Sequence, residues 1–104
     1  MDRQTWDLLR ENFEEQEFIG TGHYRLREIG NNLYEMAYLV FGPCGDKTYH
    51  PQITLRVGER IEPLKMIDTE VVPNVRLSFL DEPEKVQQAL DKLTEQFFYA
   101  KKLE

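Results

Sequence analysis

Three side chains of this sequence carry the nitrogen and sulfur atoms that zinc prefers: His23, Cys44 and His50. A zinc site usually takes its ligands in short pairs, such as two cysteines separated by two residues. Here the three residues are 21 and 6 positions apart, so no such pair exists. Isolated histidines and a small cysteine are typical of ordinary surface and core positions. We therefore expect neither a metal site nor a cofactor.

Cys44 lies in a Gly-Pro-Cys-Gly segment and precedes His50 by six residues, which puts a nucleophile and a base close together in the sequence. The backbone amides of such a loop can line an oxyanion site. The segment matches no catalytic motif, however, and a cysteine and a histidine this close occur readily by chance. Cys44 is the only cysteine, so the chain has no internal disulfide. We expect a protein that is not an enzyme.

Carboxylates are abundant, so their number alone does not indicate acid–base catalysis, which needs a carboxylate in a dry cleft. Glu35 differs from the others because it interrupts an otherwise apolar run over residues 33–41. The simplest interpretation is an ion pair with Arg27, and an acid acting on an open sheet face is the alternative. Gly20 and Gly22 lack the third glycine and the lysine of a phosphate-binding loop.

Two helices are expected to flank the residues named so far. Trp6, Leu9 and Phe13 recur at intervals of three and four, which predicts a helix over residues 5–17. Near the other end, the segment Asp-Glu-Pro-Glu at residues 81–84 is typical of a helix start. The apolar residues that follow it are spaced for one helical face: Val86, Leu90, Leu93, Phe97 and Ala100.

Between the helices, alternating apolar and polar residues predict strands. A hairpin is expected over residues 22–41, a third strand around residues 53–57, and a last strand over residues 75–80. Residues 42–51 are expected to form the longest loop, and residues 62–73 fit either an edge strand or an irregular crossing. We predict one α+β domain over residues 1–104, with an antiparallel sheet of three to five strands and both helices packed on one face.

The charges of the hairpin predict its register. A three-residue turn at residues 30–32 places Ile29 opposite Leu33 and Arg27 opposite Glu35. The same register places Leu26 opposite Met36 and Tyr24 opposite Tyr38. A two-residue turn would instead oppose Glu28 and Glu35, which carry like charges. The longer turn is therefore favoured.

The charge balance limits the kinds of partner. Lys and Arg number 13 against 19 Asp and Glu, for a net charge of −6, which argues against a general nucleic-acid binder. Residues 1–17 carry −4, residues 18–60 carry +1, and residues 61–104 carry −3. No signal peptide and no membrane-spanning run is visible, so we expect a cytoplasmic chain without membrane contact, as a monomer or homodimer.

From size, charge and the absence of motifs, we expect a small acidic, non-catalytic protein-binding module. Its most concrete form is a stoichiometric inhibitor, such as a toxin's immunity protein or a phage anti-defence protein, because a basic active-site cleft attracts an acidic surface. A second expected contact face is an arginine-rimmed sheet face on which Thr54 also lies, centred on Leu39 and Phe41. The expected binding residues are Glu11, Glu14, Glu15, Glu17, His23, Arg25, Arg27 and Arg56.

Two alternative functions stay open. The first is an acidic chaperone or adaptor that acts as a dimer, with contacts from Leu39, Phe41, Phe98 or Tyr99. The second is a small-ligand binder with a pocket under the 42–51 loop. That pocket would be lined by Tyr24, Tyr38, Tyr49 and His50.

Overall fold

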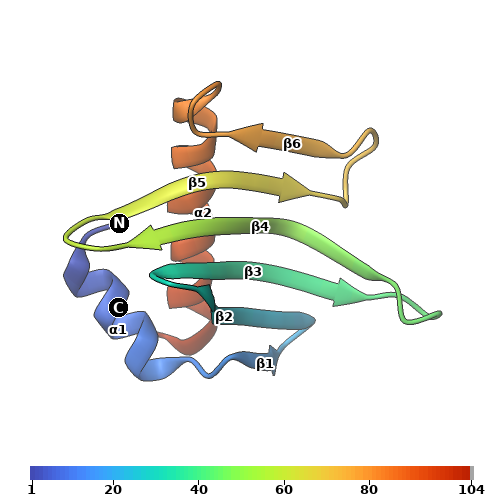
Figure 1. Cartoon of the computed structure of the whole chain (residues 1–104). Helices are drawn as coiled ribbons and strands as arrows, with labels where there is room; N and C mark the ends of the chain where they lie inside the picture. Colours follow the sequence, from blue (N-terminus) through green and yellow to red (C-terminus); the bar gives the residue numbers. More distant parts are fainter. Residues whose placement is uncertain (104) are drawn as a thin grey trace.

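A computed structural model describes residues 1–103 of the chain. The elements follow in the order α1 (Arg3–Asn12), β1 (Gln16–Ile19), β2 (Gly22–Gly30), β3 (Leu33–Phe41), β4 (Lys47–Val57), β5 (Ile61–Asp68), β6 (Val75–Ser78) and α2 (Pro83–Lys101). The strands form one antiparallel sheet in which each strand pairs with its neighbours in sequence (Figure 1). The α+β class is confirmed, but the sheet has six strands and not three to five.

Both helices pack on the same face of the sheet, as expected. Trp6 and Leu9 of α1 and Phe13, which directly follows this helix, share one buried cluster with four residues of α2. These α2 residues are Val86, Leu90, Leu93 and Phe97. The strands contribute the side chains of one face to the same cluster: Tyr24, Leu26, Met36, Ile53, Leu55, Val57, Ile61 and Met66. Because side chains alternate along a strand, the other face lies away from both helices. We call it the open face.

The first helix is shorter than the sequence predicts. Asp2 caps its start, since the carboxylate accepts a hydrogen bond from the Thr5 amide at 2.8 Å. The helix ends at Asn12, and Phe13 already has an extended backbone. The chain then enters β1, which was not predicted and which pairs with the first half of β2. A strand of four residues is too short for its period to be distinguished from that of a helix end.

The predicted hairpin register is confirmed, although the turn is not the predicted one. Arg27 pairs with Glu35, and the pairs at Leu26 and Tyr24 are also as expected. The turn itself has two residues, because Gly30 pairs with Leu33. A bulge between residues 28 and 30 restores the register, which keeps the two glutamates apart. The expected pairing of Ile29 with Leu33 is therefore wrong.

The middle of the chain is more ordered than the sequence indicates. The expected loop over residues 42–51 spans only residues 42–46, because β4 begins at Lys47. The pairing of β4 with β3 contains a register shift opposite residues 37–39 of β3. The ambiguous segment after residue 58 contains β5, which has a second shift beside Leu55. Glycine, proline and cysteine break the alternation that predicts a strand, but bulges let a strand tolerate such interruptions.

A partly buried ion pair ties the end of α2 to the segment that enters β1. The Lys101 ammonium donates to Glu17 Oε1 at 2.8 Å and to the Asn12 carbonyl at 2.6 Å. The Glu14 amide also donates to Glu17 Oε2 at 2.8 Å. Burial opposes ionisation, but the hydrogen bonds from Lys101 and from the Glu14 amide hold the pKa of Glu17 below its ordinary value of 4.5. Glu17 is therefore a structural carboxylate.

Replacing Glu17 with glutamine is expected to lower the free energy of unfolding at neutral pH by roughly 1 kcal/mol. The pKa of Glu17 is lower in the folded chain than in the unfolded chain. The ionised carboxylate therefore stabilises the fold at pH values above its unfolded pKa, and this stabilisation is lost as the pH falls through the folded pKa. The difference between wild type and Glu17→Gln should therefore vanish at strongly acidic pH. Urea unfolding across this range measures it, with the exposed Glu15→Gln as control. A difference that stays constant with pH would contradict the assignment.

Candidate functional site

The strand register arranges the open face in rows of neighbouring side chains. The row nearest the β1–β2 turn is mostly aromatic: Phe18, His23, Leu39 and Tyr49. The next row is mostly polar: Gln16, Arg25, Ala37, Gln52, Ile67 and Arg76. The third row is also mostly polar: Arg27, Glu35, Thr54, Lys65 and Ser78.

A buried ion pair lies in the middle of this face. Arg25 is 4% exposed and Glu35 is 1% exposed, although no helix covers them. Arg25 Nη1 lies 3.4 Å from Glu35 Oε2, and Arg25 Nη2 donates to Gln16 Oε1 at 2.9 Å. Arg27 Nε donates to Glu35 Oε1 at 2.6 Å, and the Gln52 amide donates to Glu35 Oε2. The expected pair between Arg27 and Glu35 is thus confirmed as part of a larger network.

This network connects four strands and leaves none of its buried polar atoms without a partner. Its members come from β1, β2, β3 and β4, and Tyr49 closes it through a contact of its hydroxyl with Arg25 at 3.4 Å. Within residues 1–103, no buried side-chain nitrogen or oxygen lacks a hydrogen bond. A buried carboxylate that accepts from three donors is well suited to hold strands in place. We therefore interpret Glu35 as a structural residue.

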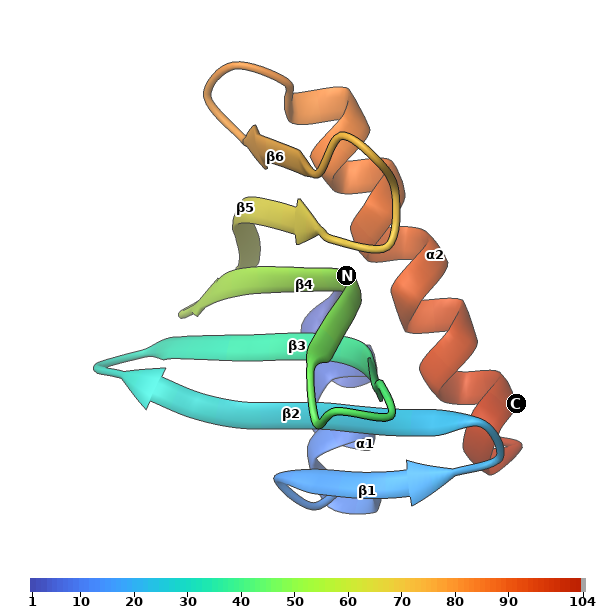
Figure 2. The same ribbon diagram turned by 90° about the vertical axis from the view of Figure 1, so that its right-hand side faces the viewer.

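Three residues expected to be exposed on this face are buried. Besides Arg25, they are Leu39 and Thr54. Leu39 lies between His23 and Tyr49, whose larger side chains flank it in the same row. Figure 2 also shows that the connection after β3 (green) bends out of the plane of the sheet, away from α2. Leu39 is therefore not available as the apolar centre of a contact surface or as a dimer contact.

Exposed apolar side chains of the open face form an aromatic cluster close to β1. The Phe18 and His23 rings are 5.1 Å apart, and the His23 and Phe41 rings are 4.8 Å apart, both with edge-to-face geometry. Phe18 is 64% exposed and Phe41 is 38% exposed. Phe18 was not predicted as a site residue because β1 was not predicted. The only sequence signal was an apolar pair, Phe18–Ile19, just before the glycines.

Acidic residues border this cluster along the chain. Glu14 and Glu15 directly precede β1, and both are exposed. Glu11 is exposed on α1, whereas Glu17 is held by Lys101. We define the β1 surface as Phe18, His23, Phe41, Glu14 and Glu15. β1 forms one edge of the sheet (Figure 1), so the β1 surface lies at that edge.

The remaining predicted site residues are not brought together. Arg56 is exposed on β4, where the strand register places it opposite residue Glu62 of β5, away from β1. Tyr24 and Tyr38 contact each other on the helix-covered side, where Tyr24 also packs on Phe97. Tyr49 lies on the open face, so the proposed ligand pocket does not form from these side chains. Cys44 is exposed in the short loop before β4.

His50 has a defined environment of its own. Its Nδ1 atom lies 2.7 Å from Asp68 Oδ2 and 3.5 Å from Glu70 Oε2. The ring borders a hollow of about 140 Å³ in which Lys92 and Gln96 are the facing polar residues of α2. No serine, threonine or cysteine lines this hollow, so the histidine has no hydroxyl or thiol nucleophile to activate there. Among residues 1–103, no three His, Cys, Asp or Glu side chains are grouped to hold a metal ion.

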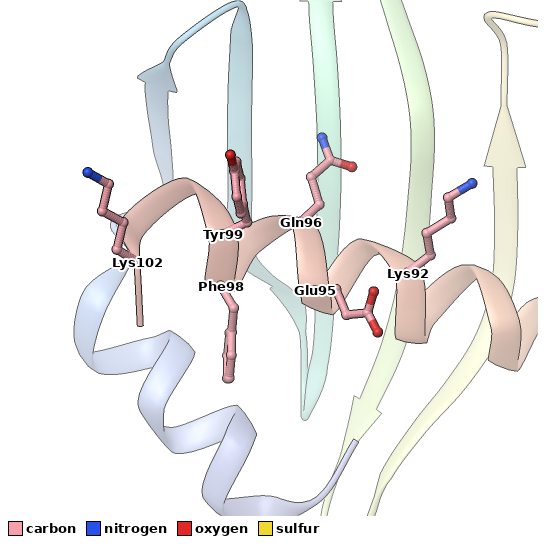
Figure 3. A pocket seen from close by; sticks show the side chains of 6 residues that line it. All are labelled: Lys92, Glu95, Gln96, Phe98, Tyr99 and Lys102. Carbon is pink, nitrogen blue, oxygen red and sulfur yellow. The ribbon is translucent and has the colours of Figure 1, made fainter. Parts of the chain in front are cut away.

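The α2 helix borders a larger hollow of about 670 Å³ near its end. All lining residues come from this one helix: Lys92, Glu95, Gln96, Phe98, Tyr99 and Lys102. Figure 3 shows that their side chains leave the helix on different sides and do not converge. This hollow therefore lacks the convergent polar groups of a ligand site. In the part of the chain that the structure describes, no helix has the length and hydrophobicity needed to cross a membrane.

In comparisons with known proteins, no family model, curated protein or solved structure matches the chain. Function therefore has to be inferred from the chemistry of the β1 surface and of the molecule's charge.

Proposed function

We propose that this chain is a small, non-catalytic protein-binding module that contacts its partner through the β1 surface. In its most concrete form it is a stoichiometric inhibitor of a basic enzyme or toxin. The observation that carries the proposal is the aromatic cluster of Phe18, His23 and Phe41 on an edge strand that follows two exposed acids, Glu14 and Glu15. Aromatic side chains supply much of the binding energy at protein interfaces.

The cluster is suited to binding because a rigid base supports it. Its three residues come from strands β1, β2 and β3, which the Arg25–Glu35 network holds in register. Rings fixed in this way lose little conformational freedom when a partner covers them. Removal of the exposed part of Phe18 from water would contribute about 25 cal/mol for each square ångström of apolar surface, against which the entropic cost of association is set.

Charge supports a basic partner. The net charge of −6 attracts a positively charged protein over distances of about one Debye length, roughly 8–10 Å. Glu14 and Glu15 place negative charge on the segment that leads into β1, the strand that carries Phe18. A compact acidic module that covers a basic active-site cleft would block that cleft without any chemistry of its own.

The double variant Phe18→Ala/Phe41→Ala is expected to lose the partner that wild type retains in affinity capture from the native cell at low salt. The reason is that the variant removes both exposed rings of the cluster but no buried core residue. The matched control is Tyr99→Ala, which removes a ring that is 86% exposed on α2. If the captured protein is an enzyme, its activity should fall to zero at an equimolar ratio.

The control variant also tests the dimeric alternative. A chaperone or adaptor that pairs through α2 should lose its partner on Tyr99→Ala, while the Phe18/Phe41 variant keeps it. That pattern would contradict the β1 surface as the contact site. Retention of the partner by both variants would contradict it as well.

The double variant Glu14→Lys/Glu15→Lys is expected to slow association with the captured partner by roughly tenfold at low salt. The reversal places positive charge where the approaching basic partner is steered. Stopped-flow mixing measures the rate, and Glu84→Lys/Glu95→Lys makes the same charge change on α2 as a control. An unchanged rate and an unchanged salt dependence would show that this acidic segment does not face the partner.

A further inference from the structure

A groove lies at the opposite edge of the sheet, where β5 extends beyond β6. The groove has a volume of about 660 Å³. Side chains from the β4–β5 hairpin, the end of β6 and the start of α2 line it, among them Arg56, Arg60, Leu64, Phe79, Leu80 and Gln87. We call it the β5 groove. Its apolar wall is unusually exposed, since Leu80 is 94% exposed.

Two arginines of this groove have no partner within the described residues. Neither Arg56 nor Arg60 forms a side-chain hydrogen bond or an ion pair with any of residues 1–103. Glu62 is the one acidic residue that lines the groove. Two nearby acids are engaged elsewhere, because Asp81 accepts from the Ser78 hydroxyl at 3.0 Å and Glu82 lies 3.9 Å from Lys85. Glu59, in the β4–β5 turn, does not line the groove. The groove therefore has positive charge available on a protein that is negative overall.

The backbone beside the groove is an uncovered strand edge. β6 pairs only with residues 65–68 of β5, so residues 61–63 have a strand neighbour on one side only. Figure 1 shows this part of β5 running past the end of β6. An extended peptide can bind along such an edge. Because Pro63 has no N–H, the edge offers few hydrogen bonds, and side-chain contacts must supply most of the affinity.

We propose that the β5 groove binds a short, extended, acidic segment of a partner protein. Carboxylates of the segment pair with Arg56 and Arg60, and its apolar side chains cover Phe79 and Leu80. This site lies at the other edge of the sheet from the β1 surface and takes a ligand of the opposite charge. The inference therefore stands independently of the proposed function. It would give the module two separate contacts.

A protein segment fits this groove better than a nucleic acid. A nucleic acid brings a dense row of phosphates, which the net charge of −6 repels, and binding normally requires an excess of basic residues. A short segment brings only a few carboxylates, and these match the two unpaired arginines in number. The apolar wall formed by Phe79 and Leu80 also has no counterpart in a phosphate backbone.

Fluorescence anisotropy with labelled peptides tests the proposal on the full chain. The probe is a peptide of about six residues, a usual strand length, in which glutamate alternates with leucine. Wild type should bind this peptide, and the same peptide with lysine for glutamate should not bind. Arg56→Ala/Arg60→Ala should weaken binding by about tenfold or more. Phe79→Ala/Leu80→Ala should also weaken it while both arginines remain.

Two controls isolate the groove. Lys92→Ala/Lys102→Ala removes the same amount of charge from α2 and should leave the affinity within about twofold of wild type, because these lysines lie outside the groove. Phe18→Ala/Phe41→Ala should also leave peptide binding unchanged, so failure at one edge of the sheet is distinguishable from failure at the other.

Several results would overturn the proposal. They are no binding of the acidic peptide to wild type, equal binding of the lysine peptide, or equal binding by the arginine variant. Tighter binding of a single-stranded oligonucleotide that depends on the same arginines would assign the groove to nucleic acid. Self-association in sedimentation that the arginine variant abolishes would assign it to the acidic surface of a second copy.

Discussion

Replacing Glu35 with alanine is expected to lower the free energy of unfolding by about 3–5 kcal/mol. Glu35 is 1% exposed and accepts hydrogen bonds from three side chains. Its removal leaves Arg25, which is 4% exposed, without its buried counter-charge. Urea unfolding followed by circular dichroism measures the change.

The double variant Arg25→Met/Glu35→Leu is the informative control. It removes both buried charges and fills their space with apolar groups, which is often close to neutral for stability. We expect it to be more stable than Glu35→Ala. If Glu35→Ala lowers the free energy of unfolding by less than about 1 kcal/mol, the pair is not sealed from water on the open face. The Arg25–Glu35 network would then not be what holds β1, β2 and β3 in register.

Replacing Phe97 with alanine is expected to lower the free energy of unfolding by about 3–5 kcal/mol. Phe97 is fully buried, and its ring lies 4.8 Å from that of Phe13 and 5.0 Å from that of Tyr24. The ring therefore joins α2 to α1 and to the sheet at one point. Its loss leaves a cavity that the surrounding rings cannot fill without moving.

The matched control for Phe97 stands two residues further along the same helix. Tyr99→Ala removes a ring of similar size that is mostly exposed, so its effect should stay within about 0.5 kcal/mol. Thermal and urea unfolding of both variants measure the difference. Alanine is a better helix former than phenylalanine or tyrosine, so helix propensity alone would not destabilise either variant. Equal destabilisation by the two variants would therefore contradict the assignment of the effect to core packing at Phe97.

The sequence predicts those elements whose pattern is long or chemically specific. The last helix has a start signal and five apolar positions on one face, and it forms over Pro83–Lys101. The hairpin register follows from one opposite-charge pair, Arg27 and Glu35, which the structure confirms. Here electrostatics and alternation agree, so the register was predictable even though the bulge at residue 29 was not.

The remaining elements depend on tertiary contacts. β1 forms because β2 provides a pairing edge, while its four residues carry too short a pattern to predict it. Arg25 and Leu39 were expected to be exposed because the sequence places them on the face away from the helices. Both residues are surrounded by side chains from neighbouring strands, an arrangement that no local pattern reveals.

The residues of the candidate site also divide into those that a local pattern predicts and those that depend on tertiary contacts. Glu14 and Glu15 were predicted as exposed acids, and the structure places them beside β1. Glu17 was grouped with them, but its ion pair with Lys101 joins residues that are 84 positions apart. Phe18 was missed for a similar reason, because its contact with His23 depends on the unpredicted pairing of β1 with β2.

The most direct test of the β1 surface is hydrogen–deuterium exchange of the chain, alone and in complex with the captured partner. β1 is a short edge strand, so its outward amides should exchange quickly in the free protein. We predict that the partner slows exchange in residues 14–19 and around Phe41, and leaves the exposed side of α2 unchanged. Slowing confined to α2 or to the β5 groove, with β1 unaffected, would contradict the account.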